Sequence, residues 1–515
     1  MGMARSWMKD ERFVPCIAAA VSLFFFCQAV VLSYSPIPFR DQWSLMRSAG
    51  IWAHFLNQWN DHKVYVSKLI LIADLEFAHG TNIINLGTIY LMLLLLGLVL
   101  ARFHPSREGR FGFWLRLFLI VPFMFSLTQL ENLSWGFQHA FVAVFLFTAS
   151  AIAAVTFIRD DVAKTALAIA ASWAAVFSLS NGLLAPAFVF LAAVLARCSK
   201  RVLIALTLSG ILAVVAFAWD YHVRGDGGSR ISAFLFDPVG KLVFISKFMG
   251  VPVFKAGNVF AHLSFQHVTV GIIGACGLAF AVRLAWIAFR RRDIVSLNLL
   301  VMLAFTVATA ALVSMGRHTI AGRYATPAMV FWACLILAAL NVLSRKSVAI
   351  AVTAFSCFLA VAQYGFLPEA KQIGDKRRFA ETAVLARVDD LQALRLVQFG
   401  RPERVLGWSD RLRRDHLSVF DNPWAGWLGS SLPGLVNGQV PDCRTEVTAV
   451  SAGDGLQVSG TGRRYRYVLA NGDGKVVGYA YQYKDARWRG HAQPAAHLAA
   501  YGVVRKSDGL ALVCP

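Results

Sequence analysis

Apolar segments of about twenty residues recur along this chain from Phe13 to Leu367. A helix needs about 20 mostly apolar residues to cross the hydrocarbon core of a membrane. Because such segments exclude charge, charged residues make up only 15% of the sequence, against about 25% in soluble domains. Residues 1–370 are therefore predicted to form an α-helical polytopic membrane domain. Residues 371–515 carry scattered charge and Gly-rich turns, which predicts a separate soluble domain.

The apolar segments predict about eleven membrane-spanning helices. They are expected near residues 13–34, 83–102, 115–128, 138–158, 164–179, 183–197, 202–220, 267–289, 294–315, 327–343 and 347–366. The first segment lacks a small-residue cleavage site after its apolar run, so we expect it to be retained as a membrane helix.

The net charge of +21 raises the question of nucleic-acid binding. Many basic residues instead cluster in short connections between apolar segments, which is the pattern of cytoplasmic loops under the positive-inside rule. These clusters are Arg5, Lys9 and Arg12; Arg107, Arg110 and Arg116; Arg197, Lys200 and Arg201; Arg290, Arg291 and Arg292; and Arg345 and Lys346. The charge therefore needs no anionic partner, and nucleic acid is excluded as a ligand.

Eleven crossings with every basic cluster inside place the N-terminus in the cytoplasm and the C-terminal domain outside it. The predicted location is the inner (plasma) membrane, with multiple spans. Cys443 and Cys514 are the two cysteines of the outer domain. Because that compartment is oxidising, we expect them to form a disulfide; two unpaired buried thiols are the alternative.

Four connections that face outside are too long or too polar to be simple turns. They cover residues 35–82, 128–138, 221–266 and 316–326. The cytoplasmic connections are short, and the sequence has no GxxxxGK[ST] phosphate loop. An ATP-driven pump is therefore disfavoured, and any chemistry is expected at the outer face of the membrane.

The first outer loop contains two groups of candidate residues. Asp41 lies just after the first membrane helix, where a carboxylate among aromatic residues can act as a general base; the alternative is a helix cap. Asp61, His62 and Lys63 can orient a phosphate, a sugar hydroxyl or a divalent metal ion. A solvated turn is the alternative for this group. No other cofactor is predicted.

Asp74 lies in the apolar stretch that follows, at residues 64–78. A carboxylate embedded in a membrane points to function, and Asp74 is a candidate to face a polar cavity. The alternative is a helix that lies in the membrane interface.

In the second outer loop, amide and carboxylate side chains alternate with aromatic ones. The candidates there are Glu131, Asn132, Trp135 and Gln138. Aromatic faces with polar neighbours suit a sugar ring, which has apolar faces and a polar rim. An interfacial aromatic belt is the alternative, and it explains Trp135 better than it explains the polar residues.

The fourth outer loop carries Arg317, Arg323 and Tyr324, against the positive-inside trend. A guanidinium group can bind a phosphate through two parallel hydrogen bonds, and lipid phosphates lie at this depth. Pairing with Asp41, with Glu131 or with lipid head groups in general is the alternative.

As a set, these segments resemble the bacterial polytopic glycosyltransferases of the GT-C class. The resemblance covers roughly residues 10–365 and is carried by Phe39-Arg40-Asp41-Gln42-Trp43, Asn60-Asp61-His62-Lys63, Gln129-Leu130-Glu131-Asn132, Trp135-Gly136-Phe137-Gln138, Ser180-Asn181-Gly182 and Gly322-Arg323-Tyr324-Ala325-Thr326-Pro327. It implies a GT-C-like fold and a donor sugar linked to polyprenyl phosphate. It also implies an acidic residue in the first outer loop, a position that Asp41 matches.

The predicted function is transfer of a sugar from a polyprenyl-phosphate donor to a glycan or lipid acceptor of the cell envelope. Arg323, helped by Arg317, would hold the phosphate, and Asp41 would take the proton of the acceptor hydroxyl. Two alternatives stay open: an O-antigen polymerase or ligase, and a transporter or flippase of lipid-linked sugars.

The C-terminal domain is predicted to be small and β-rich after a helical stretch at residues 379–397. Strands are expected at residues 447–450, 456–459, 465–469, 476–482, 499–504 and 510–513. Asn471-Gly472-Asp473-Gly474 predicts a tight hairpin turn.

The predicted orientation is tested with reporter fusions. A reporter fused after Arg292 should behave as cytoplasmic, because a basic cluster precedes it, and one fused after Pro515 should behave as external. Paired phosphatase and fluorescent-protein fusions measure both positions. A cytoplasmic C-terminus would remove the argument for chemistry at the outer face.

Overall fold

The structure is a computed structural model, and its described residues are 13–46, 55–105, 109–222, 236–259, 266–317, 319–343, 346–432, 446–506 and 509–514. Its contacts divide the chain into two compact units. Unit 1 comprises Met1–Val31, Phe55–Leu69 and Leu86–Pro368, and unit 2 comprises Leu32–His54, Ile70–Asn85 and Glu369–Pro515. Unit 2 thus contains the predicted soluble region and adds two segments from the N-terminal part of the chain.

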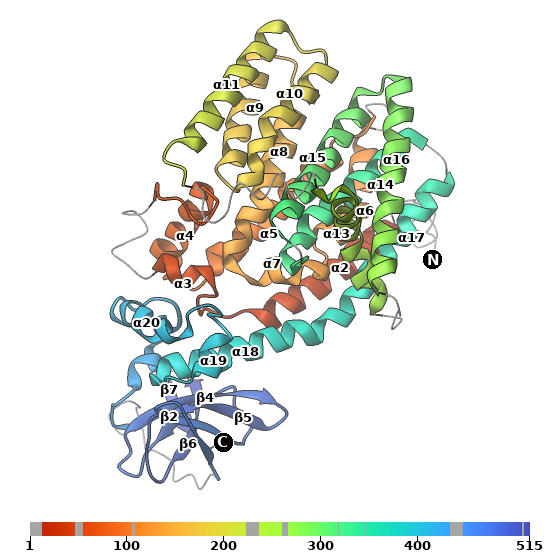
Figure 1. Cartoon of the computed structure of the whole chain (residues 1–515). Helices are drawn as coiled ribbons and strands as arrows, with labels where there is room; N and C mark the ends of the chain where they lie inside the picture. The colour runs from red at the N-terminus through yellow and green to blue at the C-terminus, as the bar shows by residue number, and fades with distance from the viewer. Residues whose placement is uncertain are drawn as a thin grey trace. The chain divides into compact units, whose positions relative to one another are not determined.

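Helices account for most of the described chain (Figure 1). The α-helices are α2 (Phe13–Ser33), α3 (Asp41–Met46), α4 (Tyr65–Ala78), α5 (Ile83–Ala101), α6 (Gly109–Met124), α7 (Leu130–Ser134), α8 (His139–Phe157), α9 (Asp161–Val176), α10 (Ala185–Leu195), α11 (Lys200–Ala218), α13 (Pro238–Asn258), α14 (Gln266–Arg291), α15 (Ile294–Gly316), α16 (Ala325–Leu343), α17 (Lys346–Ala362), α18 (Leu367–Ala386), α19 (Leu391–Arg395) and α20 (Val405–Arg414). Short 3-10 turns used below are η5 (Ser180–Leu184), η6 (Gly322–Tyr324) and η10 (Pro423–Trp427).

Nine helical segments of the described residues are long and apolar enough to cross a membrane. They are Phe13–Ser33, Ile83–Ala101, Gly112–Ser134, Gly136–Phe157, Lys200–Ala218, Val268–Arg291, Ile294–Gly316, Gly322–Leu343 and Lys346–Ala386. The other two predicted spans are also helical, but α9 and the run Ser180–Leu195 are shorter than the rest. The polytopic helical character is therefore confirmed, whereas the count of eleven stays a prediction.

Within unit 1, helices α8, α9, α10 and α11 pack against one another in one group, and α13, α14, α15 and α16 pack in a second (Figure 1). Helix α10 also packs against α15 and so joins the two groups. These helices carry apolar side chains on all of their faces, as expected of helices that contact both protein and lipid.

Helix α13 was not predicted. It lies within residues 221–266, which the sequence predicts to be an outer loop. Three lysines interrupt its apolar pattern and hide it from a search for long apolar runs. Asp237 caps its first turn by accepting a hydrogen bond from the Gly240 amide at 2.9 Å. Helices α13 and α14 approach very closely, because a Cβ at Gly250 would lie 2.0 Å from the Val270 carbonyl oxygen.

Unit 2 contains one seven-stranded antiparallel sheet, in the order β1-β2-β5-β4-β3-β6-β7. The strands are β1 (Thr448–Ala452), β2 (Gly455–Thr461), β3 (Arg466–Ala470), β4 (Val476–Lys484), β5 (Arg487–Ala492), β6 (Ala499–Lys506) and β7 (Gly509–Val513). The C-terminal sheet is confirmed, and β5 is the strand that the sequence pattern missed. The predicted turn closes the β3–β4 hairpin through a hydrogen bond from the Asn471 amide to the Lys475 carbonyl (3.0 Å).

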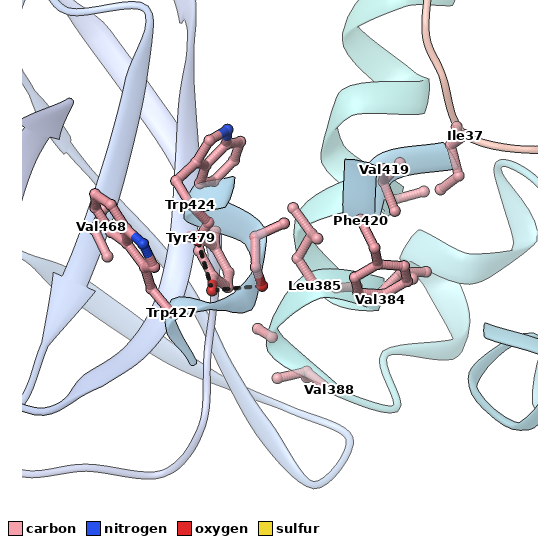
Figure 2. Packing of buried hydrophobic residues seen from close by; sticks show 14 of the residues in the cluster. Ile37, Val384, Leu385, Val388, Val419, Phe420, Trp424, Trp427, Val468 and Tyr479 are labelled. Atoms are coloured by element: carbon pink, nitrogen blue, oxygen red, sulfur yellow. Dashed lines mark hydrogen bonds between the residues drawn. The ribbon is translucent and has the colours of Figure 1, made fainter. Parts of the chain in front are cut away.

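The side chains of strand β3 are buried on both faces of the sheet. Its side chains alternate, so Val468 belongs to one apolar cluster and Tyr467 and Leu469 belong to another. The first cluster joins the sheet to helices α18 and α19 and to η10 (Figure 2). In it the Tyr479 hydroxyl donates to the carbonyl oxygens of Trp424 and Ala425, at 3.2 and 3.0 Å.

The cysteines bear on the predicted disulfide. Cys514 is disulfide-bonded, and Cys443 lies outside the described residues. Cys16, Cys27, Cys198, Cys276, Cys334 and Cys357 are free. The pairing of Cys443 with Cys514 stays a prediction.

Asp74 has a structural role rather than an open position in a cavity. Its side chain is fully buried, and its carboxylate accepts hydrogen bonds from the backbone amides of Asn82 (3.0 Å), Ile84 (2.9 Å) and Asn85 (3.3 Å). Those amides belong to the first turn of α5 and its approach, where a helix has no backbone acceptors of its own. Asp74 therefore caps α5 from helix α4.

Replacing Asp74 by alanine should destabilise the protein by about 1–2 kcal/mol, since three backbone amides at the start of α5 lose their acceptor. Glu76→Ala is the matched control, because Glu76 lies on the same helix and is exposed. Denaturant unfolding of the purified protein in detergent measures both variants. Equal loss of stability in the two would contradict the capping role.

Candidate functional site

A cavity of about 300 Å³ lies inside unit 1, among the ends of several helices and their connecting loops. It joins an apolar wall to a small set of polar groups, which is the usual composition of a ligand site. The lining residues are Asp61, His62, Phe141, Phe145, Leu179, Ser180, Asn181, Thr309, Leu312, Val313, Gly316, Arg317, Tyr324 and Pro327. The sequence-based candidates among them are His62, Arg317 and Tyr324, together with Asp61.

A tight turn presents Asp61 and His62 to this cavity. The backbone groups of Trp59 and His62 exchange hydrogen bonds of 2.8 and 2.9 Å, and Asn60 takes the left-handed conformation with φ of 50°. Asparagine accepts that conformation at lower cost than most residues. His62 Nδ1 then lies 2.7 Å from Ser180 Oγ, so the turn is tied to η5, and the two residues form one polar side of the cavity.

Two buried lysines hold this part of the first loop in place. The Lys63 ammonium donates to the carbonyl oxygen of Trp219, at the end of α11, and Lys68 donates to the carbonyl oxygens of Phe55 (2.8 Å) and Asn57 (2.5 Å). Burial lowers the pKa of Lys68 to about 8. Lys63 does not line the cavity, so these contacts favour a supporting role for it over the predicted contact with substrate.

Asn181 lines the cavity with a buried side chain. Its side chain is 7% exposed, and its Nδ2 donates to Thr309 Oγ1 at 3.1 Å. Its Oδ1 has no hydrogen-bond partner among the described residues. A buried acceptor without a partner is costly, so Asn181 keeps hydrogen-bonding capacity that the described residues do not use.

The two candidate arginines have different surroundings. Arg317 is exposed and lines the cavity, and no carboxylate of the described chain forms an ion pair with it. Arg323 Nη1 instead lies 3.8 Å from Glu131 Oε1, and the Arg323 guanidinium stands 5.3 Å from the centre of the Tyr324 ring. Pairing with Glu131, one of the predicted alternatives, is thus found for Arg323. Arg317 is the arginine whose guanidinium group is available to a ligand.

Residues 128–138 contact residues 316–326. Asn132 Nδ2 donates to the Arg323 carbonyl and to Thr326 Oγ1, both at 2.7 Å. Thr326 Oγ1 in turn donates to Gln129 Oε1 at 2.5 Å. These bonds fix η6 and with it the position of Tyr324.

Trp135 and Gln138 lie away from the cavity lining. Trp135 is 3% exposed and Gln138 is 1% exposed. Neither side chain presents a surface on which a sugar ring could stack in this conformation. Their predicted contact with substrate is a hypothesis that the cavity does not support.

Asp41 belongs to unit 2, whereas the cavity belongs to unit 1. It is the first residue of α3, where a carboxylate is favoured by the helix dipole. The Gln42 side chain accepts a hydrogen bond from the Phe39 amide (3.0 Å) and donates one to Asn82 (2.6 Å), which holds this turn. The predicted catalytic role of Asp41 stays a prediction.

No group of three or more His, Cys, Asp or Glu side chains that could hold a metal ion occurs among the described residues. No family model, curated protein sequence or solved structure matches the chain. The site is therefore interpreted from its own residues.

Two residues of the cavity, Ser180 and Asn181, were not predicted as site residues. Their only sequence signal was a short polar run, Ser180-Asn181-Gly182, between two apolar segments. Helix-period patterns predict where such a run interrupts a helix but not which distant loop it faces. The partners His62 and Thr309 lie more than a hundred residues away in the chain.

Proposed function

We propose that this protein is a membrane glycosyltransferase that uses the cavity of unit 1 to bind a sugar linked to polyprenyl phosphate. The observation that carries this proposal is the composition of one cavity. It combines a guanidinium group that has no carboxylate partner among the described residues, a carboxylate, a histidine and a buried asparagine with a wall of phenylalanine and leucine side chains. These features complement the three parts of a lipid-linked sugar phosphate. The guanidinium suits the anion, the polar groups suit the sugar hydroxyls, and the apolar wall suits the lipid tail.

Arg317 is the proposed ligand of the donor phosphate. It lines the cavity and has no carboxylate partner among the described residues, so its charge is available. A guanidinium fork matches two phosphate oxygens. In this proposal Arg323 has a supporting role, because it lies beside Glu131.

The polar wall formed by His62, Ser180 and Asn181 is proposed to bind the sugar. All three residues line the cavity, and their imidazole, hydroxyl and amide groups can donate to and accept from sugar hydroxyls. Tyr324, held by Phe248 stacked at 5.5 Å, supplies an aromatic edge. The cavity of about 300 Å³ is at the small end of ligand sites, which favours one sugar over an oligosaccharide.

Transfer needs a base for the acceptor hydroxyl. Asp61 lines the cavity with Arg317 and is the base that this geometry favours, while Asp41 is the base that the sequence favours. The base takes the hydroxyl proton as the acceptor oxygen attacks the anomeric carbon. The bond from that carbon to the phosphate oxygen breaks, and the lipid phosphate leaves with the bonding electrons. Arg317 stabilises the charge that grows on the leaving phosphate.

The acceptor is proposed to be a glycan or lipid of the cell envelope, reached at the outer face of the inner membrane. The basic clusters of the sequence support this placement, because they favour an orientation with the C-terminal domain outside the cytoplasm. A polymerase or ligase that moves oligosaccharides, and a flippase that forms no bond, are the competing functions, and the transfer assay below separates them.

The test is transfer of label from radiolabelled polyprenyl-phosphate hexoses to endogenous acceptors in membrane vesicles. Arg317→Gln should raise the donor KM by roughly tenfold to a hundredfold, because a charge-assisted contact is lost. Asp61→Asn should lower kcat by about a hundredfold to ten-thousandfold if it is the base. Arg201→Gln and Asp485→Asn are matched controls at exposed positions.

Asp41→Asn decides between the two carboxylates. If it abolishes transfer while Asp61→Asn retains it, the base is Asp41 and the geometric assignment is wrong. If the wild-type protein moves labelled lipid across the vesicle membrane but forms no glycosidic bond, the enzyme proposal fails in favour of a flippase. Transfer from oligosaccharide donors alone would indicate a polymerase or ligase.

A further inference from the structure

Unit 2 contains a second, smaller cavity of about 60 Å³. It lies where helix α18 and the segment after α2 face the sheet and η10, and all of its lining residues belong to unit 2. They are Tyr34, Ser35, Pro36, Arg378, Glu381, Thr382, Leu385, Trp424, Tyr465, Arg466, Ala480 and Tyr481. Nothing in the proposed transfer reaction uses it.

A buried carboxylate faces this cavity. Glu381 is 8% exposed, and no donor of the described residues forms a hydrogen bond or an ion pair with it. The guanidinium groups of Arg466 and Arg378 act on it through space. Buried carboxylates are normally paired or hydrogen-bonded, so Glu381 lacks the partner that its burial requires.

Arg466 is a second group with spare hydrogen-bonding capacity. Its guanidinium stacks 5.0 Å from the centre of the Trp424 ring and 5.8 Å from that of Tyr465. No acceptor of the described chain bonds to it. By contrast, Arg378 forms an ion pair with Asp375 at 3.1 Å. The Arg466 donors are thus held at the cavity by aromatic stacking.

Trp424 is the third residue of the cavity lining with unused hydrogen-bonding capacity. Its side chain is 5% exposed, and its indole Nε1 has no hydrogen-bond partner in the described structure. Buried indole N–H groups usually find an acceptor. The ring is fixed by its edge contact with Tyr479, at 5.1 Å, within the cluster drawn in Figure 2. Tyr465, at 55% exposure, lines the same cavity and is open to solvent.

We propose that this cavity binds the hydroxyl-bearing edge of a neutral sugar. Glu381 and Arg466 carry opposite charges, so together they favour neither an anion nor a cation, and they offer both a hydrogen-bond acceptor and hydrogen-bond donors. A hydroxyl both donates and accepts, so two neighbouring hydroxyls satisfy Glu381 and Arg466 together. Aromatic rings around the groups pack on the C–H face of a sugar ring.

The volume sets how much of the ligand enters. A cavity needs about 10–15 Å³ to hold one water, so about 60 Å³ holds only a few polar atoms. The ligand therefore inserts one edge, and the rest of the sugar lies against Tyr465. This geometry suits the terminal residue of a glycan, because a residue inside a chain is substituted on both sides.

The inference does not rest on the transferase proposal, since it uses other residues in the other unit. Saturation-transfer NMR of the purified full-length protein in detergent, with methyl glycosides of glucose, galactose and mannose as probes, tests it. At least one should bind saturably. Glu381→Gln and Arg466→Gln should each weaken that binding by about tenfold or more. Inorganic phosphate and glucuronate should compete poorly.

Asp485→Asn and Arg463→Gln are the matched controls, because both residues are exposed and lie outside the cavity lining. Unchanged melting temperatures show that the variants fold, and Trp424→Phe, which keeps the ring and removes the N–H, provides a milder change. Binding that is lost in Arg317→Gln but kept in Glu381→Gln belongs to unit 1 and overturns this inference without harming the transferase proposal. Absence of saturable binding to all three glycosides also overturns it.

Discussion

The described structure depends on one constraint: polar backbone groups at the ends of apolar helices must find partners without water. Buried side chains supply them. Asp74 accepts three amides at the start of α5, Lys68 donates to two carbonyl oxygens of the first loop, and Asn132 donates to the carbonyl of Arg323. Each bond is worth more here than in water, because the alternative is an unsatisfied group in a low-dielectric interior.

These bonds also sort the functional candidates. A polar residue in a membrane protein invites a functional interpretation, but one whose hydrogen bonds are all made within the protein has little left to offer a ligand. Lys63 and Asp74 belong to this kind. Asn181 and Arg317 differ, because one keeps a buried acceptor without a partner and the other keeps a charge without a carboxylate among the described residues. Spare capacity at the cavity of unit 1, rather than polarity alone, identifies the candidate site.

The same criterion applies in unit 2, where the sheet is covered by apolar clusters on both faces. Such packing leaves few polar groups inside. Glu381, Arg466 and the Trp424 indole are exceptions that gather at one cavity. Packing alone does not require them there, since an apolar residue would fill the space at lower cost. The two cavities share an amphipathic character but differ in size, which is why different parts of a carbohydrate ligand are proposed for them.

The sequence by itself determined the helical membrane class, because about twenty apolar residues in a row permit little else. It also determined the β3–β4 hairpin, whose Asn-Gly turn is a local signal, and most strands of the sheet. It did not reveal α13, whose lysines break the apolar pattern. It also could not separate Arg317 from Arg323, since both lie in one short loop. Only the tertiary structure placed Glu131 beside Arg323 and His62 beside Ser180, because those contacts join residues far apart in the chain, and no local pattern encodes which distant loop a side chain will meet.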